Sequence, residues 1–274
     1  MVAGRLWVIA TPIGNLDDLS PRAAEVLRTV GLVAAEDTRH SAPLLARVGS
    51  NARMVALHEH NERDIAERIA ASVLAGENVA LIADAGTPLV SDPGFRVVRA
   101  VREAGGVVSP VPGPCAAIAA LSVAGLPSDR FVFEGFLPAK SAARRERMRA
   151  LASETRTLIF YESSHRIAES LADAVAEFGD AREAVLAREL TKLFETIIAA
   201  PLGEVLSRVE ADPNQQRGEF VLLVAGAADA DADAQLAEGR RVFALLREEL
   251  PPAKAAKLAA AISGAPRKAL YHSG

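Results

Sequence analysis

Short apolar runs alternate with longer amphipathic stretches in the first part of the chain, and this alternation limits the possible folds more than any other feature. Residues 6–10, 32–35, 54–57, 79–83 and 107–111 have the length and composition of buried strands. The stretches between them have helical spacing, and Ser20-Pro21 and Asn61 provide N-terminal caps for two of these helices. Strands that alternate with helices typically form a mostly parallel sheet, so we expect an α/β domain.

A second series of strands is predicted at residues 131–134, 157–161, 184–187, 196–199 and 220–224, with helices at 142–152 and 167–178. A further helical pattern at 116–124 fits either half of the chain, so the boundary is defined only to within several residues. We place one α/β domain at 1–114 and a second at 115–226.

The C-terminal part has a different composition. In residues 227–234, Asp229, Asp231 and Asp233 alternate with alanine and no apolar pattern is present, so we expect a solvated linker. Residues 235–274 are predicted to form a small helical domain, with helices at 235–250, 252–263 and 266–272. This segment carries seven Lys or Arg residues against three Glu.

The overall composition excludes several classes of protein. The net charge of −4 over 274 residues means that any nucleic-acid contact must come from a local basic patch. Cys115 is the only cysteine and has no partner for an internal disulfide, as is usual in the cytoplasm. No apolar run has the length of a signal-peptide core or a membrane span. We therefore expect a soluble cytoplasmic protein with no membrane contact.

Three Gly- and Pro-containing turns follow predicted strands, at residues 11–15, 84–88 and 112–117. Ligands bind at the carboxyl ends of strands in open α/β sheets. Gly86 and Gly113 allow close approach of a ligand, and the prolines stiffen the loops. Each turn alone is typical of a tight connection, but three together indicate a pocket. The glycine-rich dinucleotide fingerprint and the phosphate-binding loop are both missing from the sequence.

Two other groups of polar residues have more than one interpretation. His58 and His60 face the same side of an extended segment, but a zinc site needs three or four ligands and no second cluster completes one. We expect no metal site there. Residues 140–149 have a local charge of +4, and both a solvated helix face and a phosphate-binding surface produce this pattern.

Nine short motifs carry a resemblance to a known family: Ala-Thr-Pro-Ile-Gly-Asn-Leu (10–16), Ala-Glu-Asp-Thr-Arg (35–39), His-Glu-His-Asn-Glu (58–62), Asp-Ala-Gly-Thr-Pro (84–88), Ser-Asp-Pro-Gly (91–94), Phe-Glu-Gly-Phe-Leu-Pro (133–138), Phe-Tyr-Glu-Ser (160–163), Arg-Glu-Leu-Thr-Lys (188–192) and Gly-Glu-Phe (218–220). They resemble the signatures of the ribosomal RNA small-subunit methyltransferase I family, within the tetrapyrrole methylase superfamily. The resemblance extends nearly to the predicted linker.

This resemblance implies two α/β domains of tetrapyrrole-methylase type with S-adenosylmethionine in a cleft between them, and a homodimer. It implies 2′-O-methylation of a cytidine ribose in the decoding region of 16S rRNA, within the small ribosomal subunit. The residues that it places at the cofactor are Pro12, Asp84, Ala85, Gly86, Thr87, Pro88, Cys115, Ala116, Tyr161, Glu162, Leu190 and Phe220. Cys115 stands where the family usually has serine, and Ser164 where it usually has proline.

The implied reaction is attack of the ribose 2′-oxygen on the sulfonium methyl group, without a metal. The candidates for a general base are Glu36, Asp37, Glu59 and Glu162. The resemblance also favours phosphate contact by Arg39, Lys140, Arg144, Arg145, Arg147 and Arg149.

Two alternative functions remain. One is methyl transfer to a porphyrinoid ring by an enzyme of the same fold, although a small substrate needs neither basic patches nor added C-terminal helices. The other is a ribosome-binding protein without catalysis.

Overall fold

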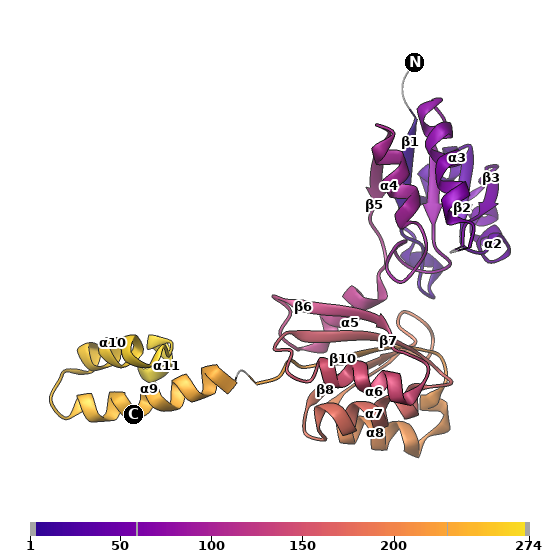
Figure 1. Cartoon of the computed structure of the whole chain (residues 1–274). Helices are drawn as coiled ribbons and strands as arrows, with labels where there is room; N and C mark the ends of the chain where they lie inside the picture. Colours follow the sequence, from indigo (N-terminus) through magenta and orange to yellow (C-terminus); the bar gives the residue numbers. More distant parts are fainter. Residues whose placement is uncertain (1–3, 59, 229, 272–274) are drawn as a thin grey trace. The chain divides into compact units, whose positions relative to one another are not determined.

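The computed structural model describes residues 4–58, 60–228 and 230–271, and Figure 1 shows the course of the chain. The contacts divide the chain into two compact units. Unit 1 contains Met1–Ala152 and Thr157–Ala225, and unit 2 contains Ser153–Arg156 and Gly226–Gly274. Among the described residues, no helix combines the length and the apolar composition needed to cross a membrane.

Unit 1 begins with a five-stranded parallel sheet in the order β3-β2-β4-β1-β5. Its strands are β1 (Arg5–Ile9), β2 (Leu32–Ala35), β3 (Arg53–Ala56), β4 (Val79–Ile82) and β5 (Val107–Val111). This confirms the parallel sheet predicted from the alternating pattern, with β2 and β5 at the predicted positions and the others within about one residue.

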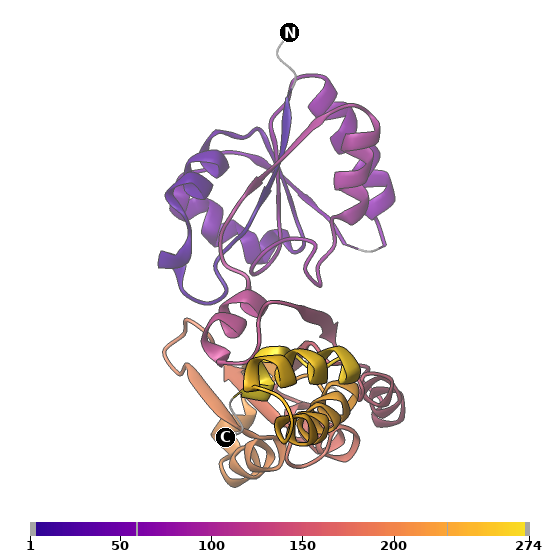
Figure 2. The same cartoon turned by 90° about the vertical axis from the view of Figure 1, so that its left-hand side faces the viewer.

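Helices cover both faces of this first sheet, as Figure 2 shows. Side chains of α1 (Pro21–Thr29) and α2 (Thr38–Val48) form an apolar core on one face, and those of α3 (Glu62–Leu74) and α4 (Phe95–Glu103) form a core on the other. A short 3₁₀ helix, η1 (Leu16–Asp18), follows β1. Because both faces are covered, ligands reach the sheet only at its edges and at its strand ends.

The second sheet of unit 1 is mixed, in the order β6-β7-β10-β8-β9. Its strands are β6 (Phe131–Phe136), β7 (Thr157–Ser163), β8 (Glu183–Arg188), β9 (Thr196–Pro201) and β10 (Glu219–Val224). The β6–β7 pair is parallel and the other pairs are antiparallel. Because β7 and β10 are antiparallel, the C-terminal end of β7 lies beside the N-terminal end of β10.

Helices also cover both faces of the second sheet. One core lies under α6 (Ser141–Ala150), α7 (Ile167–Phe178) and α8 (Leu202–Ala211), with η2 (Pro213–Gln216) after α8. The other face packs against α5 (Ala116–Ala124). Helix α5, which the sequence pattern at 116–124 could not assign to either half of the chain, therefore packs on the second sheet. A domain boundary near residue 114 remains our proposal, because both sheets belong to one compact unit.

Unit 2 contains three helices, α9 (Ala230–Arg247), α10 (Pro252–Ser263) and α11 (Arg267–Tyr271). Val242, Ala259, Ala265 and Leu270 form its small core. Helix α9 begins at Ala230, inside the segment 227–234 that the sequence assigned to a linker, and alanine has the highest helix propensity. Asp229 in that segment and His272, the predicted end of the last helix, lie outside the described residues.

Candidate functional site

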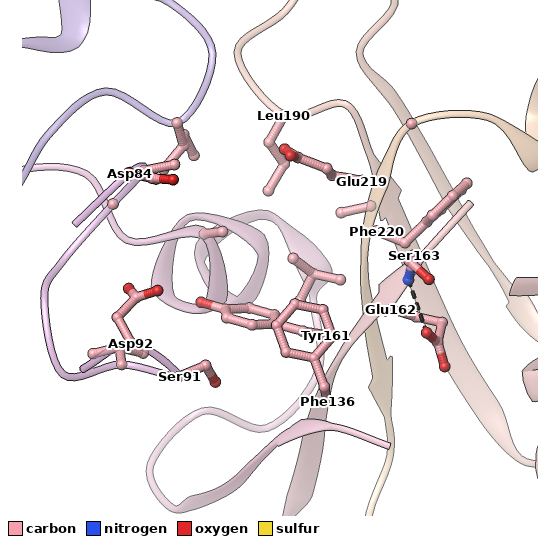
Figure 3. Close-up of a pocket in the computed structure, with 18 of the residues that line it drawn as sticks. Asp84, Ser91, Asp92, Phe136, Tyr161, Glu162, Ser163, Leu190, Glu219 and Phe220 are labelled. Atoms are coloured by element: carbon pink, nitrogen blue, oxygen red, sulfur yellow. Dashed lines mark hydrogen bonds between the residues drawn. The ribbon is translucent and has the colours of Figure 1, made fainter. Parts of the chain in front are cut away.

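A cavity of about 460 Å³ in unit 1, the main cavity, lies where the loops after β2, β4, β7 and β8 meet the start of β10 (Figure 3). The residues that line it are Ile13, Glu36, Asp84, Ala85, Gly86, Thr87, Val90, Ser91, Asp92, Ala116, Phe136, Tyr161, Glu162, Ser163, Ser164, Ala187, Leu190, Gly218, Glu219, Phe220 and Val221. It is large enough for a small organic ligand or cofactor.

Hydrogen bonds join the three turns that the sequence singled out. The Thr11 N–H donates to the Gly86 carbonyl over 2.9 Å, and the Gly86 N–H donates back to the Thr11 carbonyl over 3.1 Å. The Thr87 hydroxyl donates to the Pro114 carbonyl over 2.9 Å. These bonds tie the loops after β1, β4 and β5 into one wall, as expected for a ligand pocket at strand ends.

The loop after β4 has an unusual backbone. Gly86 has a φ of 80°, and a Cβ atom there would lie 3.3 Å from Cγ2 of Ile13. Leu89 and Ser91 also have positive φ, at 72° and 68°, which is uncommon for residues other than glycine. Such strain persists where the surrounding structure enforces it, and it clusters at functional sites.

Three carboxylates enter the main cavity from the loops after β2 and β4, and we call Glu36, Asp84 and Asp92 the acidic cluster. Asp84 accepts a hydrogen bond from the Asp37 N–H over 3.0 Å. Burial, together with Glu36 and Asp84, raises the pKa of Asp92 from 3.8 to about 7. Burial and the charge of Asp84 also raise the pKa of Glu36. No Lys, Arg or His is among the described residues that line this cavity, so it favours a cationic ligand.

Aromatic and apolar side chains form the opposite wall. The ring of Tyr161 meets those of Phe133 and Phe136 edge to face, with centroids 5.0 and 5.5 Å away. The Tyr161 hydroxyl accepts a hydrogen bond from the Ala117 N–H over 3.1 Å, at the start of α5. Burial raises the pKa of Tyr161, so this phenol stays neutral at physiological pH. The wall offers apolar contact without a competing charge.

Most of the residues predicted for the cofactor line the main cavity: Asp84, Ala85, Gly86, Thr87, Ala116, Tyr161, Glu162, Leu190 and Phe220. Pro12 lines a second, smaller cavity. Pro88 and Cys115 are not among the lining residues of either cavity. Cys115 is the N-cap residue of α5, and its thiol makes no capping hydrogen bond. Cofactor contact by each of these residues remains a prediction.

The four candidate bases differ in their surroundings. Glu36 lines the cavity. The Glu162 carboxylate is only 1% exposed, pairs with Arg166 over 2.7 Å and accepts a 2.6 Å hydrogen bond from the Ser170 hydroxyl. It points away from Asp84 and Asp92 in Figure 3. Glu162 is therefore engaged in holding the end of β7, and its role as a base remains a prediction.

Asp37 is also engaged elsewhere. Its carboxylate caps α2 by accepting the Arg39 N–H over 2.8 Å, and it pairs with the Arg39 guanidinium. Hydrogen bonds from Arg39 lower the pKa of Asp37 to about 2, which makes it a weak proton acceptor. Glu59 lies outside the described residues. Of the three predicted bases that the structure describes, Glu36 has the most suitable position.

Several cavity residues were not assigned to the site from the sequence: Ser91, Asp92, Phe136, Ser163, Ser164, Gly218 and Glu219. All but Ser164 lie within motifs at 91–94, 133–138, 160–163 and 218–220, and Ser164 directly follows one of them. The motifs therefore contained the signal. In contrast, the burial that raises the pKa of Asp92 depends on packing between distant loops, which the sequence does not reveal.

The basic segment at 140–149 is largely neutralised. Arg145 and Arg149 both pair with Glu177, and Arg147 pairs with Glu134. Arg144 is completely buried and pairs with Asp173 over 2.6 Å, so the expected contact between Arg144 and phosphate is wrong. Burial forces this arginine to find its counterion within the fold. The side chains of Arg145, Arg147 and Arg149 remain 46%, 50% and 64% exposed.

No metal site is apparent in residues 4–58, 60–228 and 230–271, where no group of three or more His, Cys, Asp or Glu side chains has a suitable arrangement. The rings of His58 and His60 lie 6.0 Å apart, edge to face.

The chain matches two family models. Residues 5–206 match Tetrapyrrole (Corrin/Porphyrin) Methylases, and residues 233–272 match the RsmI C-terminal HTH domain. The first match contains both sheets apart from β10, and the second contains the helices of unit 2. Together they cover nearly all of the described elements.

Comparison with curated proteins gives full-length similarity. The chain is 62% identical to "Ribosomal RNA small subunit methyltransferase I" of Xylella fastidiosa (strain Temecula1), over 98% of both chains. It is 56% identical to the protein of the same name from Escherichia coli O157:H7, over 98% of this chain and 93% of that one.

Among solved structures, uroporphyrin-III C-methyltransferase from Thermus thermophilus in complex with S-adenosylhomocysteine has a TM-score of 0.55 and 18% identity. The match covers 81% of this chain and 97% of that one. At this identity the likeness shows a shared fold.

Proposed function

The chain belongs to the ribosomal RNA small-subunit methyltransferase I family of tetrapyrrole methylases, and from this premise we propose that it methylates the 2′-hydroxyl of a cytidine in the decoding region of 16S rRNA. Its cofactor is S-adenosylmethionine. Full-length relatives bear a ribosomal RNA name, so methyl transfer to a porphyrinoid ring and a non-catalytic ribosome-binding role are not favoured. We propose that the protein acts in the cytoplasm, where small ribosomal subunits are assembled.

The observation that carries the proposal is the charge of the main cavity. S-adenosylmethionine has a sulfonium and an ammonium group against one carboxylate, and when bound it supplies an activated methyl group. Glu36, Asp84 and Asp92 favour such a cation, and the residues described in this cavity include no competing Lys, Arg or His. Tyr161, Phe136 and Leu190 give apolar surface on the other side. We propose that these residues hold the cofactor.

The chain's own residues have two tasks in this reaction. The larger is positioning, because correctly oriented reactants gain roughly 7–11 kcal/mol. The bonded loops at Thr11, Gly86 and Thr87 provide a fixed wall for this purpose. The second task is accepting the hydroxyl proton, which typically adds about 10²- to 10⁴-fold. We assign it to Glu36 or Asp92, whose raised pKa values make them better proton acceptors than an ordinary carboxylate.

Two surfaces support contact with RNA phosphates. On α10, Lys254 and Lys257 are exposed one turn apart, and residues 250–274 contain no Asp or Glu. On α6, Arg145, Arg147 and Arg149 are partly exposed but already paired with carboxylates. We propose that α10 supplies the stronger phosphate contact, because its lysines belong to a segment without acidic residues. Lys140 and Arg39 are proposed to add further contacts.

We also propose that the protein is a homodimer. Several large apolar side chains of the second sheet's loops and of helix α5 are exposed in the single chain, among them Leu193 at 90%, Phe194 at 66% and Val123 at 53%. Exposed apolar groups of this kind are typical of protein interfaces. A symmetric interface would remove them from water.

The proposed function is tested by single-turnover methyl transfer. Small subunits from a strain that lacks this modification are incubated with the protein and S-adenosylmethionine carrying a labelled methyl group. We expect one methyl group per subunit, on a cytidine ribose of 16S rRNA. Binding of cofactor and subunits without transfer would favour the non-catalytic role, and transfer only to a porphyrinoid would favour the other alternative.

A further inference from the structure

A second cavity, of about 310 Å³, adjoins the main cavity in unit 1. It is lined by Thr11, Pro12, Ile13, Gly14, Leu16, His40, Ser41, Pro43, Leu44, Ala83, Asp84, Ala85, Lys192 and Glu219. Ile13, Asp84, Ala85 and Glu219 line both cavities. Molecules that occupy the two cavities would therefore meet at a shared wall.

The chemistry of the second cavity differs from that of the first. His40 and Lys192 contribute to its lining, whereas the described lining of the main cavity includes no basic residue. The Lys192 ammonium bonds to Glu189 and Glu219, each over 2.9 Å, and its stem lies against Gly14. His40 is exposed in the first turn of α2. The N-terminal end of a helix favours negative groups, so the part of the rim at His40 suits an anion, whereas Asp84 and Glu219, which also line this cavity, do not.

Ser41 in the second cavity has a hydroxyl without a hydrogen-bond partner among the described residues. Ser41 is only 3% exposed, and its side chain makes no hydrogen bond with any residue that the structure describes. Its oxygen is not among the fully buried side-chain atoms without a partner, so it is open to the cavity and available to a ligand. A polar ligand atom in this cavity would supply the missing hydrogen bond. Leu16, Pro43 and Leu44 give the cavity an aliphatic side.

We propose that the second cavity binds the target nucleotide of the RNA. The base lies against Leu16, Pro43 and Leu44, and the Ser41 hydroxyl bonds to a polar atom of the nucleoside. The ribose lies at the shared wall, beside the bound cofactor. This inference rests on the proposed function and identifies the substrate subsite. A nucleotide in this cavity has to leave its base stack, as in other enzymes that act on single nucleotides.

The rim contains groups that suit the nucleotide's phosphate. The imidazole of His40 offers an N–H donor, and the side chain of Arg39 is 90% exposed next to it. Two nitrogens of the Arg39 guanidinium, Nε and Nη2, bond to Asp37, which leaves Nη1 available for an outside acceptor. Arg39, predicted from the sequence to contact RNA, directly precedes two residues that line the cavity, His40 and Ser41.

The test uses a substitution that narrows the second cavity and a matched control substitution on the same helix, α2. Leu44→Trp adds a large side chain at a half-buried position that lines the second cavity, and Ala46→Trp adds the same side chain at an exposed position outside it. Calorimetry with S-adenosylhomocysteine verifies the fold and the main cavity in both variants. Two further readouts are kcat/KM for methyl transfer to small subunits and binding of cytidine 5′-monophosphate, detected by saturation-transfer NMR with S-adenosylhomocysteine present.

We expect Leu44→Trp to lower kcat/KM by more than about tenfold and to lose the nucleotide signal, because a displacement of about 1 Å in a bound reactant can cost 10²-fold. Ala46→Trp should match the wild type. Equal behaviour of the two variants in both assays, with cofactor affinity intact, would overturn the inference. A third outcome separates the two proposals. If the wild type binds the nucleotide but methylates no subunit, and Leu44→Trp abolishes the binding, the subsite stands and the proposed function is rejected.

If Leu44→Trp fails to bind the cofactor, His40→Glu decides by the same two readouts, since His40 is exposed and its replacement leaves the core intact. We expect weaker nucleotide binding and a higher KM for subunits, because a carboxylate at the rim repels phosphate. No change in either quantity would overturn the inference.

Discussion

Replacement of Asp92 by asparagine is predicted to stabilise the protein, with an effect that depends on pH. Asp92 is half-buried beside Glu36 and Asp84, and its pKa rises to about 7 from the usual 3.8. None of the described residues donates a hydrogen bond to its carboxylate, so asparagine removes a charge without removing a bond. The folded protein holds the Asp92 proton more tightly than the unfolded chain.

The sign and size of the effect on the free energy of unfolding follow from the linkage between proton binding and folding. Between pH 3.8 and about 7 the folded state binds more protons at Asp92 than the unfolded state does, so wild-type stability falls as the pH rises. The loss of stability caused by the charged Asp92 carboxylate reaches its full value above about pH 7. A pKa difference of this size corresponds to about 4 kcal/mol for a fully buried group, and partial exposure of Asp92 reduces it to roughly 1–2 kcal/mol.

Thermal unfolding of wild type and Asp92→Asn is measured at pH 4 and pH 8 without cofactor. We expect little difference at pH 4 and a higher Tm for the variant at pH 8, by roughly 2–8 °C. Asp129→Asn is the matched control, because its side chain is 79% exposed. An equal Tm of wild type and Asp92→Asn at pH 8 would refute the electrostatic account of the acidic cluster.

Three other predictions concern the cofactor loop, the RNA contact and the assembly. Gly86→Val should weaken S-adenosylhomocysteine binding in calorimetry, because the added side chain crowds Ile13 in the cavity wall, whereas Gly49→Val, with similar backbone strain but open space around it, should not. Lys254→Ala/Lys257→Ala should reduce the log–log salt slope of subunit binding by about 1.4 to 1.8, and an unchanged slope would contradict phosphate contact by α10. Light scattering over a dilution series should give a dimer mass, and a stable monomer at micromolar concentration would contradict the proposed homodimer.

The strands and most helices of unit 1 were predictable from local patterns. Buried strands such as β2 and β4 are continuous apolar runs, and the α3 helix has an apolar face at regular spacing. The start of α9 was not predicted, because alternating alanine and aspartate has no apolar face although alanine favours helix. Where a segment has no apolar face, helix propensity is the only local feature from which its secondary structure can be predicted.

The sequence identified the loops that form the site, but it did not identify the role of each side chain in them. The turns at Thr11, Gly86 and Pro114 were identified from glycine and proline, and the structure joins them by hydrogen bonds. Arg144 was misassigned because its counterion, Asp173, comes from helix α7, 29 residues further along the chain. Charge in the sequence identifies an ionisable side chain, but its partner depends on packing.

The most direct test of the central claim is the position of the transferred methyl group. Small subunits that lack the modification are incubated with the protein and S-adenosylmethionine labelled in its methyl group, and the labelled nucleotide is mapped in wild-type and Leu44→Trp reactions. We predict label on the 2′-oxygen of one decoding-region cytidine for the wild type, and strongly reduced label at the same position for the variant. Label on a base, on another RNA or on no RNA at all would contradict the account.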